Sequence, residues 1–512
     1  MTAADFRESL RRYNPRVFVN GQAVESVADE PLLAPGIDAI GVAYDLALED
    51  RFRALMTATQ PTSGKIVNRM LHINTSTTDL LHKLEAIREL CKRSGCAQRY
   101  LTHDAFNAIY QATHRMDAEN GTDYHQRFTA YMHHVQDEDL TCGVAMTDAK
   151  GDRSLHPHEQ PVPDAYVHIV ERRPDGIVIS GVKAIVTGAP YVHDLLVMPC
   201  RTMREADADF AVCCAVPLDA EGITIASRPA GRPGEKAAKF SARYGQATGA
   251  VIFEKVFVPW DRVFMAGEWA HSEYLTTSYG THHRHSCIGA RAGFGDLLIG
   301  AGVMMTEANG LDPNKHGHIR DAMVELITIV EGFFACGVAA SVYGRLDAAG
   351  NYEPDGVFAN VGKLIMATKI YDMHRLAHYV SGGLVVALPG PDEDHNPATA
   401  ASLGQVLAGR ADIPAARRME VGRLLEDLTA SYTGSWYSLI SLHGGGSPEA
   451  MKREIWRQYP VGDKVALVDS LLDRGVTTAS ANGLDGPDGR CCDTGCEAPE
   501  LLTAIAKSEA DT

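Results

Sequence analysis

The sequence has no excess of positive charge. Its 65 Asp and Glu residues outnumber its 48 Lys and Arg residues, and the formal net charge of the 512 residues is -17. The basic residues are scattered among the acidic ones, so we expect no surface that follows a phosphate backbone. A nucleic-acid partner is therefore not expected.

The sequence also has few features of a secreted or membrane protein. Its first residues, MTAADFRESLRRYNP, carry charges where a signal peptide needs an apolar segment, and no apolar stretch is expected to be long enough to span a bilayer. Eleven cysteines are few for this length, their number is odd, and a large cytosolic chain needs no disulfides. We expect a cytoplasmic protein with free thiols and no membrane partner.

A glycine-rich dinucleotide fingerprint is absent, which disfavours a Rossmann domain. Instead, the apolar pattern changes period twice: it is helical in 1–145, alternates in short runs in 146–272 and is helical again in 273–476. This order predicts an α+β protein with an N-terminal helical domain, a central β-barrel domain and a C-terminal four-helix bundle. The last segment, 477–512, is interpreted as a loosely attached tail that carries Cys491, Cys492 and Cys496.

Seven segments then carry a resemblance. They are DAFNAIY (104–110), NGTDYHQRFTAYMHHVQDEDL (120–140), AMTDAKGDRSLHP (145–157), DGIVISGVKAIVTGA (175–189), FVPWDRVF (257–264), HRHS (283–286) and HGGGSPEA (443–450). In this order they resemble the superfamily of 4-hydroxyphenylacetate 3-hydroxylase and 4-hydroxybutyryl-CoA dehydratase, and the dehydratase branch more closely. The resemblance implies an acyl-CoA dehydrogenase-like fold and FAD as the cofactor.

A threonine followed by a glycine ends one of the predicted β-runs. Gly188 has no Cβ, so the backbone can approach a planar ring while the Thr187 hydroxyl donates to a ring nitrogen or oxygen. A lone Thr-Gly pair is more often a turn cap. The resemblance assigns this place to the flavin, and it implies further cofactor contacts from Gln98, Ala189, His283, Arg291 and Gly445.

The dehydratase branch holds a four-iron cluster with three Cys and one His, because soft sulfur matches iron. The first Cys position of that set matches Cys96, but the second is Tyr100. The His position matches His283, and the third Cys is Ala290. Two of three thiolates are missing, so we predict no iron-sulfur cluster and no metal.

Two nearby thiols leave one alternative open. Cys91 precedes Cys96 by five residues, and Cys287 follows His283 by four, which is one helical turn. A rearranged metal site is conceivable on this spacing. We favour the interpretation that these cysteines are small buried side chains.

Other active positions of both branches are replaced. A Glu of the dehydratase branch aligns with Ile440, a Tyr with Cys287 and a Lys with Arg291. Because isoleucine cannot move a proton, elimination of water from an unactivated hydroxyacyl thioester is not expected. Recognition of 4-hydroxyphenylacetate itself is not expected either, since the substrate contacts of the hydroxylase branch align with Leu101, Ala105 and Val144.

The remaining polar candidates are mostly histidines. The run Thr281 to His285 would by itself often be the start of a solvated helix. With the resemblance, we predict His283 as the acid or base facing the flavin, and His103 and Arg284 as further catalytic candidates. Arg284 is either structural or an anion clamp.

Three functions follow from the resemblance. The leading hypothesis is a two-component monooxygenase that receives reduced FAD from a separate flavin reductase and hydroxylates an aromatic or phenolic substrate. The alternatives are a flavin-dependent acyl-CoA dehydratase or isomerase, and a flavin-binding subunit without turnover. The helices between Ala322 and Leu442 carry apolar residues on more than one face, including Ile327, Ile329, Val330, Phe333 and Phe334, so we expect a homotetramer or dimer.

Overall fold

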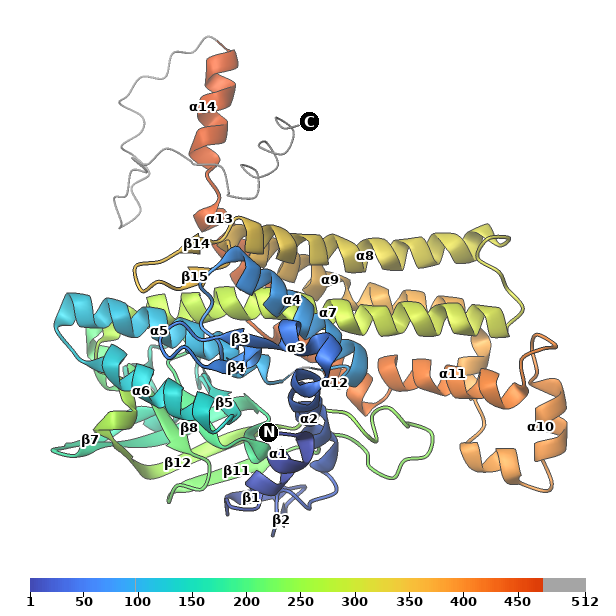
Figure 1. The fold of residues 1–512 in the computed structure, drawn as a ribbon, viewed down its shortest axis with the longest axis horizontal. Coiled ribbons are helices and arrows are strands. Elements are labelled where there is room, and N and C mark those ends of the chain that lie inside the picture. Colours follow the sequence, from blue (N-terminus) through green and yellow to red (C-terminus); the bar gives the residue numbers. More distant parts are fainter. Residues whose placement is uncertain (97, 473–512) are drawn as a thin grey trace.

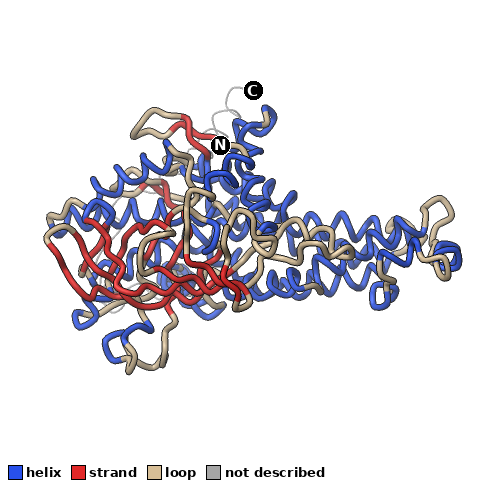
Figure 2. Tube along the Cα trace, turned by 90° about the horizontal axis from the view of Figure 1, so that it is seen from below, coloured by secondary structure: helices blue, strands red, loops and turns tan. Residues whose placement is uncertain are grey.

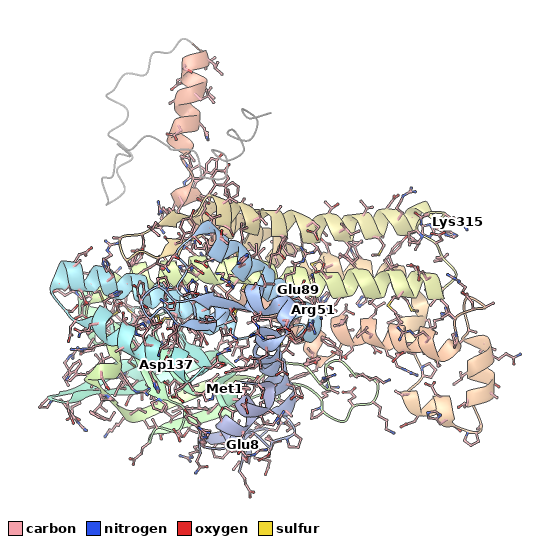
Figure 3. All side chains as sticks on the ribbon, in the orientation of Figure 1. Met1, Glu8, Arg51, Glu89, Asp137 and Lys315 are labelled. Atoms are coloured by element: carbon pink, nitrogen blue, oxygen red, sulfur yellow. The ribbon has the colours of Figure 1, made fainter. Side chains whose placement is uncertain are left out.

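The computed structural model describes residues 1–96 and 98–472. Within them, the sheets and a layer of N-terminal helices gather at one end, and a long helical bundle extends toward the other (Figures 1 and 2). Charged side chains such as Glu8 and Lys315 lie on the surface (Figure 3). The predicted tail with Cys491, Cys492 and Cys496 lies outside the described residues.

The N-terminal part is mainly helical, and local capping explains two of its long helices. Ser76 accepts a hydrogen bond from the Asp79 amide at the start of α4, and Gly95 and Gly121, with φ of 69° and 68°, end α4 and α5. The helices are α1 (Ala3–Leu10), α2 (Ala34–Leu48), α3 (Asp50–Met56), α4 (Thr77–Ser94), α5 (Tyr100–Asn120) and α6 (Tyr124–Asp137), and a small hairpin joins β3 (Thr57–Thr59) to β4 (Ile66–Asn68).

The strands form two larger sheets. One has the order β2-β1-β11-β12-β8-β6 with β7 also paired to β8, and the other has the order β13-β10-β9-β5. The predicted hairpin around Pro174 and Asp175 joins β7 to β8, since Arg173 pairs with Gly176. The strands are β1 (Arg16–Val19), β2 (Gln22–Ala23), β5 (Cys142–Ala145), β6 (Thr147–Asp148), β7 (His168–Arg173), β8 (Gly176–Thr187), β9 (Asp194–Val197), β10 (Val212–Pro217), β11 (Ile223–Ser227), β12 (Thr248–Pro259) and β13 (Val263–Ala266).

This topology differs from the predicted β-barrel in closure. The two larger sheets of the described strands are open. They are separate because β5 pairs with β9 while β6, which begins two residues later, pairs with β8. The sheets also take strands from 1–145, the segment expected to be a helical domain: β1 pairs in parallel with β11. Alternation of apolar residues predicts strands, but it does not say which strands pair.

The C-terminal part is a bundle around α7. This helix packs against α4 and α5 from the N-terminal part and against α8, α9 and α11 from its own. The bounds are α7 (Ser272–Ala308), α8 (Gly317–Val342), α9 (Gly356–Ser381), α10 (Ala400–Val406), α11 (Ala415–Thr429), α12 (Tyr432–His443), α13 (Pro448–Gln458) and α14 (Val461–Leu471), with a short pair of strands, β14 (Arg345–Leu346) and β15 (Tyr352–Glu353), between α8 and α9.

Two bundle helices are long and apolar enough to cross a membrane by length and composition. They are Trp269–Ala308 and Gly317–Val342, with apolar windows that are 67% and 44% buried inside the protein. The expectation that no stretch has this length was therefore wrong. A core helix of a bundle meets the same criterion, because its own side chains must be apolar on several faces to pack against the helices around it.

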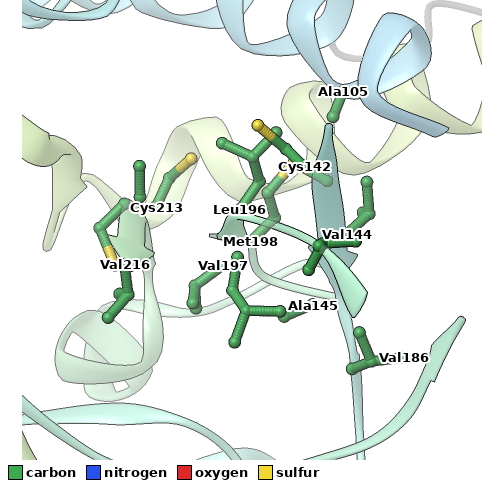
Figure 4. Close-up of a cluster of buried hydrophobic side chains, with 14 of the residues drawn as sticks. Ala105, Cys142, Val144, Ala145, Val186, Leu196, Val197, Met198, Cys213 and Val216 are labelled. Carbon is green, nitrogen blue, oxygen red and sulfur yellow. The ribbon is translucent and has the colours of Figure 1, made fainter. Parts of the chain in front are cut away.

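An apolar cluster fastens the N-terminal helices to the sheets. Ala105 of α5 lies above the strands that carry Val144 and Leu196, and Met198 directly follows β9 (Figure 4). Ala105 is fully buried and Val144 is 7% exposed. Two positions that align with substrate contacts of the hydroxylase branch are thus part of the packed core.

Candidate active site

The centre of the candidate site is a histidine held between α5 and α7. Asp104 Oδ2 on α5 lies 3.1 Å from His283 Nδ1. Cys287, one helical turn further along α7, places its Sγ 3.6 Å from His283 Nε2. The rings of Tyr279 and Tyr100 pack against the imidazole at centroid distances of 5.3 and 5.8 Å. We call these five residues the His283 cluster.

Asp104 is fully buried and has several partners. Ser286 donates to its Oδ1 at 2.6 Å, and Lys83 Nζ lies 3.6 Å from the same atom. Burial alone would raise the pKa of Asp104, but Lys83 and the hydrogen bonds from His103 and His283 hold it well below its usual range. The carboxylate therefore stays ionised and fixes the orientation of the imidazole.

The thiol and the imidazole shift each other's protonation. Burial would lower the pKa of His283, but Cys287 and Asp104 raise it to about 9. Burial would likewise raise the pKa of Cys287, yet His283, with Lys363 and Arg291, lowers it to about 6. The two shifts run in opposite directions, and both favour a thiolate beside an imidazolium.

Arg284 and Gly445 close the cluster on the side of the C-terminal helices. Arg284 Nε donates to the Gly445 carbonyl at 2.9 Å. Gly445 has φ of +75°, and a Cβ there would lie 3.1 Å from His283 Cδ2, so a glycine lets the loop after α12 approach the imidazole. One turn beyond Cys287, Arg291 donates to Ser441 and stacks over the Tyr437 ring at 4.0 Å.

A cleft of about 500 Å³ opens beside Arg284. It lies between the β-strands' loops, the start of α7 and α13. Its charged lining is mainly basic, which suits an anionic ligand. The basic residues are Lys150, Arg153, Arg201, Arg284 and Arg453, and the acidic ones are Glu273 and Glu454.

A second part of the site lies at the end of β8, and we call Gln98, Thr187 and Gly188 the Gln98 corner. Gln98 Nε2 donates to the Thr187 carbonyl at 3.2 Å. Gly188 has φ of +74°, and a Cβ there would overlap Gln98 Nε2, so the space above this glycine is filled by the glutamine. The buried Gln98 Oε1 has no hydrogen-bond partner among the described residues. Ala189, fully buried, follows at the start of a short 3-10 helix.

His103 lies behind Asp104, with its Nδ1 3.6 Å from Asp104 Oδ1. Its Nε2 is 3.2 Å from Asn74 Oδ1, next to Asn107, and burial lowers its pKa to about 4. It therefore supports the buried polar network behind Asp104. Sequence reasoning missed the role of Asp104, whereas the spacing of four residues had already suggested that Cys287 lies near His283 on one helix face.

The positions of the two missing cluster thiolates are packed. Tyr100 is 8% exposed and Ala290 is 1% exposed, and both contribute to the same apolar cluster. Burial raises the pKa of Cys91, and it raises that of Cys96 to about 12, so both behave as inert buried thiols. Within residues 1–96 and 98–472, no three His, Cys, Asp or Glu side chains are grouped to hold a metal ion.

Solved structures share this fold. The oxygen-tolerant archaeal 4-hydroxybutyryl-CoA dehydratase from N. maritimus superposes with a TM-score of 0.88 at 37% identity, over 92% of this chain and 95% of that one. The oxygenase component of 4-hydroxyphenylacetate 3-monooxygenase complexed with FAD gives 0.82 at 22% identity, over 92% and 98%. The predicted acyl-CoA dehydrogenase-like fold is confirmed by these neighbours.

Sequence families give the same assignment. The family described as 4-hydroxyphenylacetate 3-hydroxylase matches with its N-terminal part over residues 2–265 and with its C-terminal part over residues 272–473. The chain belongs to the 4-hydroxyphenylacetate 3-hydroxylase family, as its motifs predicted.

Two relatives differ in the reaction that their names give. The 4-hydroxybutyryl-CoA dehydratase/vinylacetyl-CoA-Δ-isomerase of Clostridium aminobutyricum is 35% identical over 92% of this chain and 99% of its own. The oxygenase component of 4-hydroxyphenylacetate 3-monooxygenase from Thermus thermophilus is 24% identical over 90% and 94%. The relatives are enzymes of both kinds, so family membership supports an enzyme without selecting one reaction.

Proposed function

We propose that the protein is an FAD-dependent monooxygenase of the two-component type, acting on an aromatic or phenolic substrate. The observation that carries this proposal is the packing at Tyr100 and Ala290, which leaves no thiolates at two positions where the dehydratase branch binds its cluster. A flavin-only reaction is compatible with such a site. Reduced FAD would come from a separate flavin reductase, as in relatives that are oxygenase components.

The Gln98 corner fits a flavin ring. Gln98 Oε1 is a buried acceptor without a partner among the described residues, and a ring N–H would satisfy it. The Thr187 side chain is half-buried at the end of β8, where its hydroxyl is free to rotate toward a ring atom. Bound FAD would supply the reaction with oxygen, and the protein would supply position, a dry environment and a proton.

The His283 cluster is suited to moving that proton. Asp104 holds Nδ1, so Nε2 is the nitrogen that exchanges a proton. Tyr279 and Tyr100 pack against the imidazole, and His283 is only 7% exposed, so its contact with water is limited. Because Cys287 and Asp104 raise the pKa of His283, the imidazole rests in its protonated form and acts first as an acid.

The experiment combines the purified protein with FAD, NADH, a generic flavin reductase and a panel of phenols. We expect oxygen consumption that depends on one of the phenols and a product heavier by one oxygen atom. Omitting the protein but keeping the reductase gives the background of flavin autoxidation. Absence of a hydroxylated product with every phenol would contradict the proposal.

A second candidate is a flavin-dependent acyl-CoA dehydratase or isomerase. The basic cleft beside Arg284 favours it, since its lining suits the phosphates of a CoA thioester, and the dehydratase relative is 35% identical. The same protein, anaerobic and without reductase, would then convert vinylacetyl-CoA to crotonyl-CoA. That conversion, with no phenol hydroxylation, would select this candidate over the first.

We also propose that the chain forms a homotetramer or dimer. Helix α14 projects from the rest of the chain (Figure 1) and has no buried residue. Its apolar side chains are therefore exposed, for example Leu471 at 78%. A helix of eleven residues is not stable alone in water, so a second copy is the natural cover. Of the side chains from which assembly was predicted, Ile327 is half-exposed at 42%, and the others are buried within the chain. A stable monomer in light scattering at micromolar concentration would contradict this proposal.

A further inference from the structure

Cys287 stands out among the cysteines that the structure describes. Burial raises the pKa of the thiols Cys91, Cys213 and Cys336, whereas that of Cys287 is lowered. The cause is local geometry, since its Sγ lies 3.6 Å from an imidazole whose other nitrogen faces a buried carboxylate. A thiol, an imidazole and a carboxylate in this order are the arrangement that activates a cysteine as a nucleophile.

The surroundings of Cys287 favour a negative charge on sulfur. Cations approach it from two elements besides its own helix, α4 and α9, and the neutral neighbours are two tyrosines and a thiol. The titratable and charged groups around the pair are Lys83 and Cys91 on α4, Tyr100 and Asp104 on α5, Tyr279, His283, Arg284 and Arg291 on α7 and Lys363 on α9. Lys363, fully buried, donates to the Ser441 carbonyl and has no carboxylate partner in an ion pair of the described residues.

Access to this sulfur is restricted by size. Cys287 is 4% exposed and His283 is 7% exposed, while the basic cleft begins at the adjacent Arg284. A large electrophile cannot reach a side chain with so little exposed surface, so only a reagent of about the size of water is a candidate partner for this sulfur. Cys287 is therefore an activated thiol that we expect only small reagents to reach.

We propose that Cys287 is a peroxide-reactive site, at which hydrogen peroxide oxidises the thiolate to a sulfenic acid. The sulfur lone pair attacks one peroxide oxygen and the O–O bond breaks. The leaving hydroxide takes the Nε2 proton of the His283 imidazolium and departs as water. Sulfur is oxidised by two electrons and the peroxide is reduced by two. His283 supplies the leaving-group proton, and Asp104 keeps its ring in place.

This inference does not depend on which of the two reactions the protein catalyses. Its substrate is a peroxide of small size, and its product is a modified enzyme with a neutral sulfenic acid beside the imidazole. Loss of the thiolate removes one of the two anions that keep His283 protonated, so oxidation would alter the proton donor of the proposed active site. Oxidation and turnover are measured separately and fail separately.

The experiment exposes the full-length protein, with FAD bound, to limiting hydrogen peroxide in the presence of a cyclic 1,3-dione that traps sulfenic acids. Peptide mass spectrometry measures the rate of labelling at each cysteine. Cys336 is the internal control, because it is more exposed than Cys287 but burial raises its pKa and its thiol donates to the Gly332 carbonyl. We expect Cys287 to be labelled at least about tenfold faster than Cys336 at pH 7.5.

Two further measurements separate an activated thiol from an accessible one. His283→Gln keeps a polar side chain but removes the imidazolium, and it should slow labelling at Cys287 by about tenfold or more while Cys336 is labelled as before. In the unmodified protein, labelling at Cys287 should be level between pH 7 and 8 and decline as the pH falls below about 6, the pKa of this thiol.

Three results would overturn the proposal, and the first needs no variant. Equal or slower labelling of Cys287 than of Cys336 in the folded protein would exclude an activated thiol. Unchanged labelling in a folded His283→Gln protein would exclude the role of the imidazole. Catalase added before the peroxide should abolish labelling at Cys287, and labelling that persists would mean that peroxide is not the oxidant.

Discussion

The Gln98 corner and the His283 cluster are built from different interactions. In the Gln98 corner, the contacts are neutral: a side-chain amide donates to the Thr187 carbonyl, and Gly188 leaves room for that amide. In the His283 cluster, ionised groups are buried together, with Asp104 and Cys287 on the two sides of one imidazole. We propose that the first geometry positions the flavin ring and that the second moves protons. Changing one part should therefore alter binding or turnover separately.

The largest expected effect concerns the iron content of the His283 cluster. We predict that the protein contains no iron-sulfur cluster, because Tyr100 and Ala290 stand where thiolates are needed and both are packed in an apolar cluster. Anaerobic purification followed by iron and sulfide assay measures this. Near-stoichiometric four-iron content would show that the His283 cluster is a metal site and would remove the contrast between the two parts.

The next largest effect is expected when the imidazole of His283 is removed. His283→Ala should slow product formation by about a hundredfold while FAD affinity stays nearly unchanged, since the proton donor is lost but the Gln98 corner is intact. Hydrogen peroxide release should rise, because oxygen would be reduced without reaching the substrate. His285→Gln is the matched control: His285 is buried on the same helix but contacts Gly337 and Ser341. Loss of FAD binding in His283→Ala would assign the histidine to the cofactor cradle.

A smaller effect is expected at the glycine of the Gln98 corner. Gly188→Ala should weaken FAD binding roughly tenfold, because the new Cβ displaces the Gln98 amide and the left-handed backbone is strained. Gly121→Ala is the control, since Gly121 has φ of +68° and a Cβ there would meet nothing within 4 Å. Both variants should lose stability through strain. Equal FAD affinity in the two variants would show that Gln98 does not contact the cofactor.

Much of this arrangement is predictable from the sequence. The apolar periods give the helices and strands, and the ordered motifs give the family, because both are local properties of the chain. Strand pairing is not local: β1 joins β11 across more than two hundred residues, and no pattern within either strand specifies it. The pattern could therefore predict neither that the two larger sheets are open nor that β1 of the N-terminal segment joins one of them.

The candidate site also has residues that the sequence predicts and residues whose roles depend on long-range contacts. His283 and Thr187 lie in recognisable motifs and were predicted as candidates. Asp104, although it begins a motif, gains its role from a contact with α7 that spans 179 residues. Cys287 was interpreted as a small buried side chain, because burial is typical of a free cysteine. What the sequence could not supply was the direction of its sulfur, toward the imidazole and the cations around it.

The smallest expected effect tests the hydroxyl in the Gln98 corner. Thr187→Val removes that hydroxyl but keeps a β-branched side chain at the end of β8, where Thr187 pairs with Thr248 of β12. If the hydroxyl donates to the flavin ring, FAD affinity should fall by about 1 kcal/mol, which is several-fold. Turnover at saturating FAD should remain nearly unchanged, because the His283 cluster is untouched. FAD titration followed by product measurement on the same sample separates the two quantities. Unchanged affinity would leave the Thr187 hydroxyl without a role in binding and would place recognition of the ring on the unpaired Gln98 carbonyl oxygen.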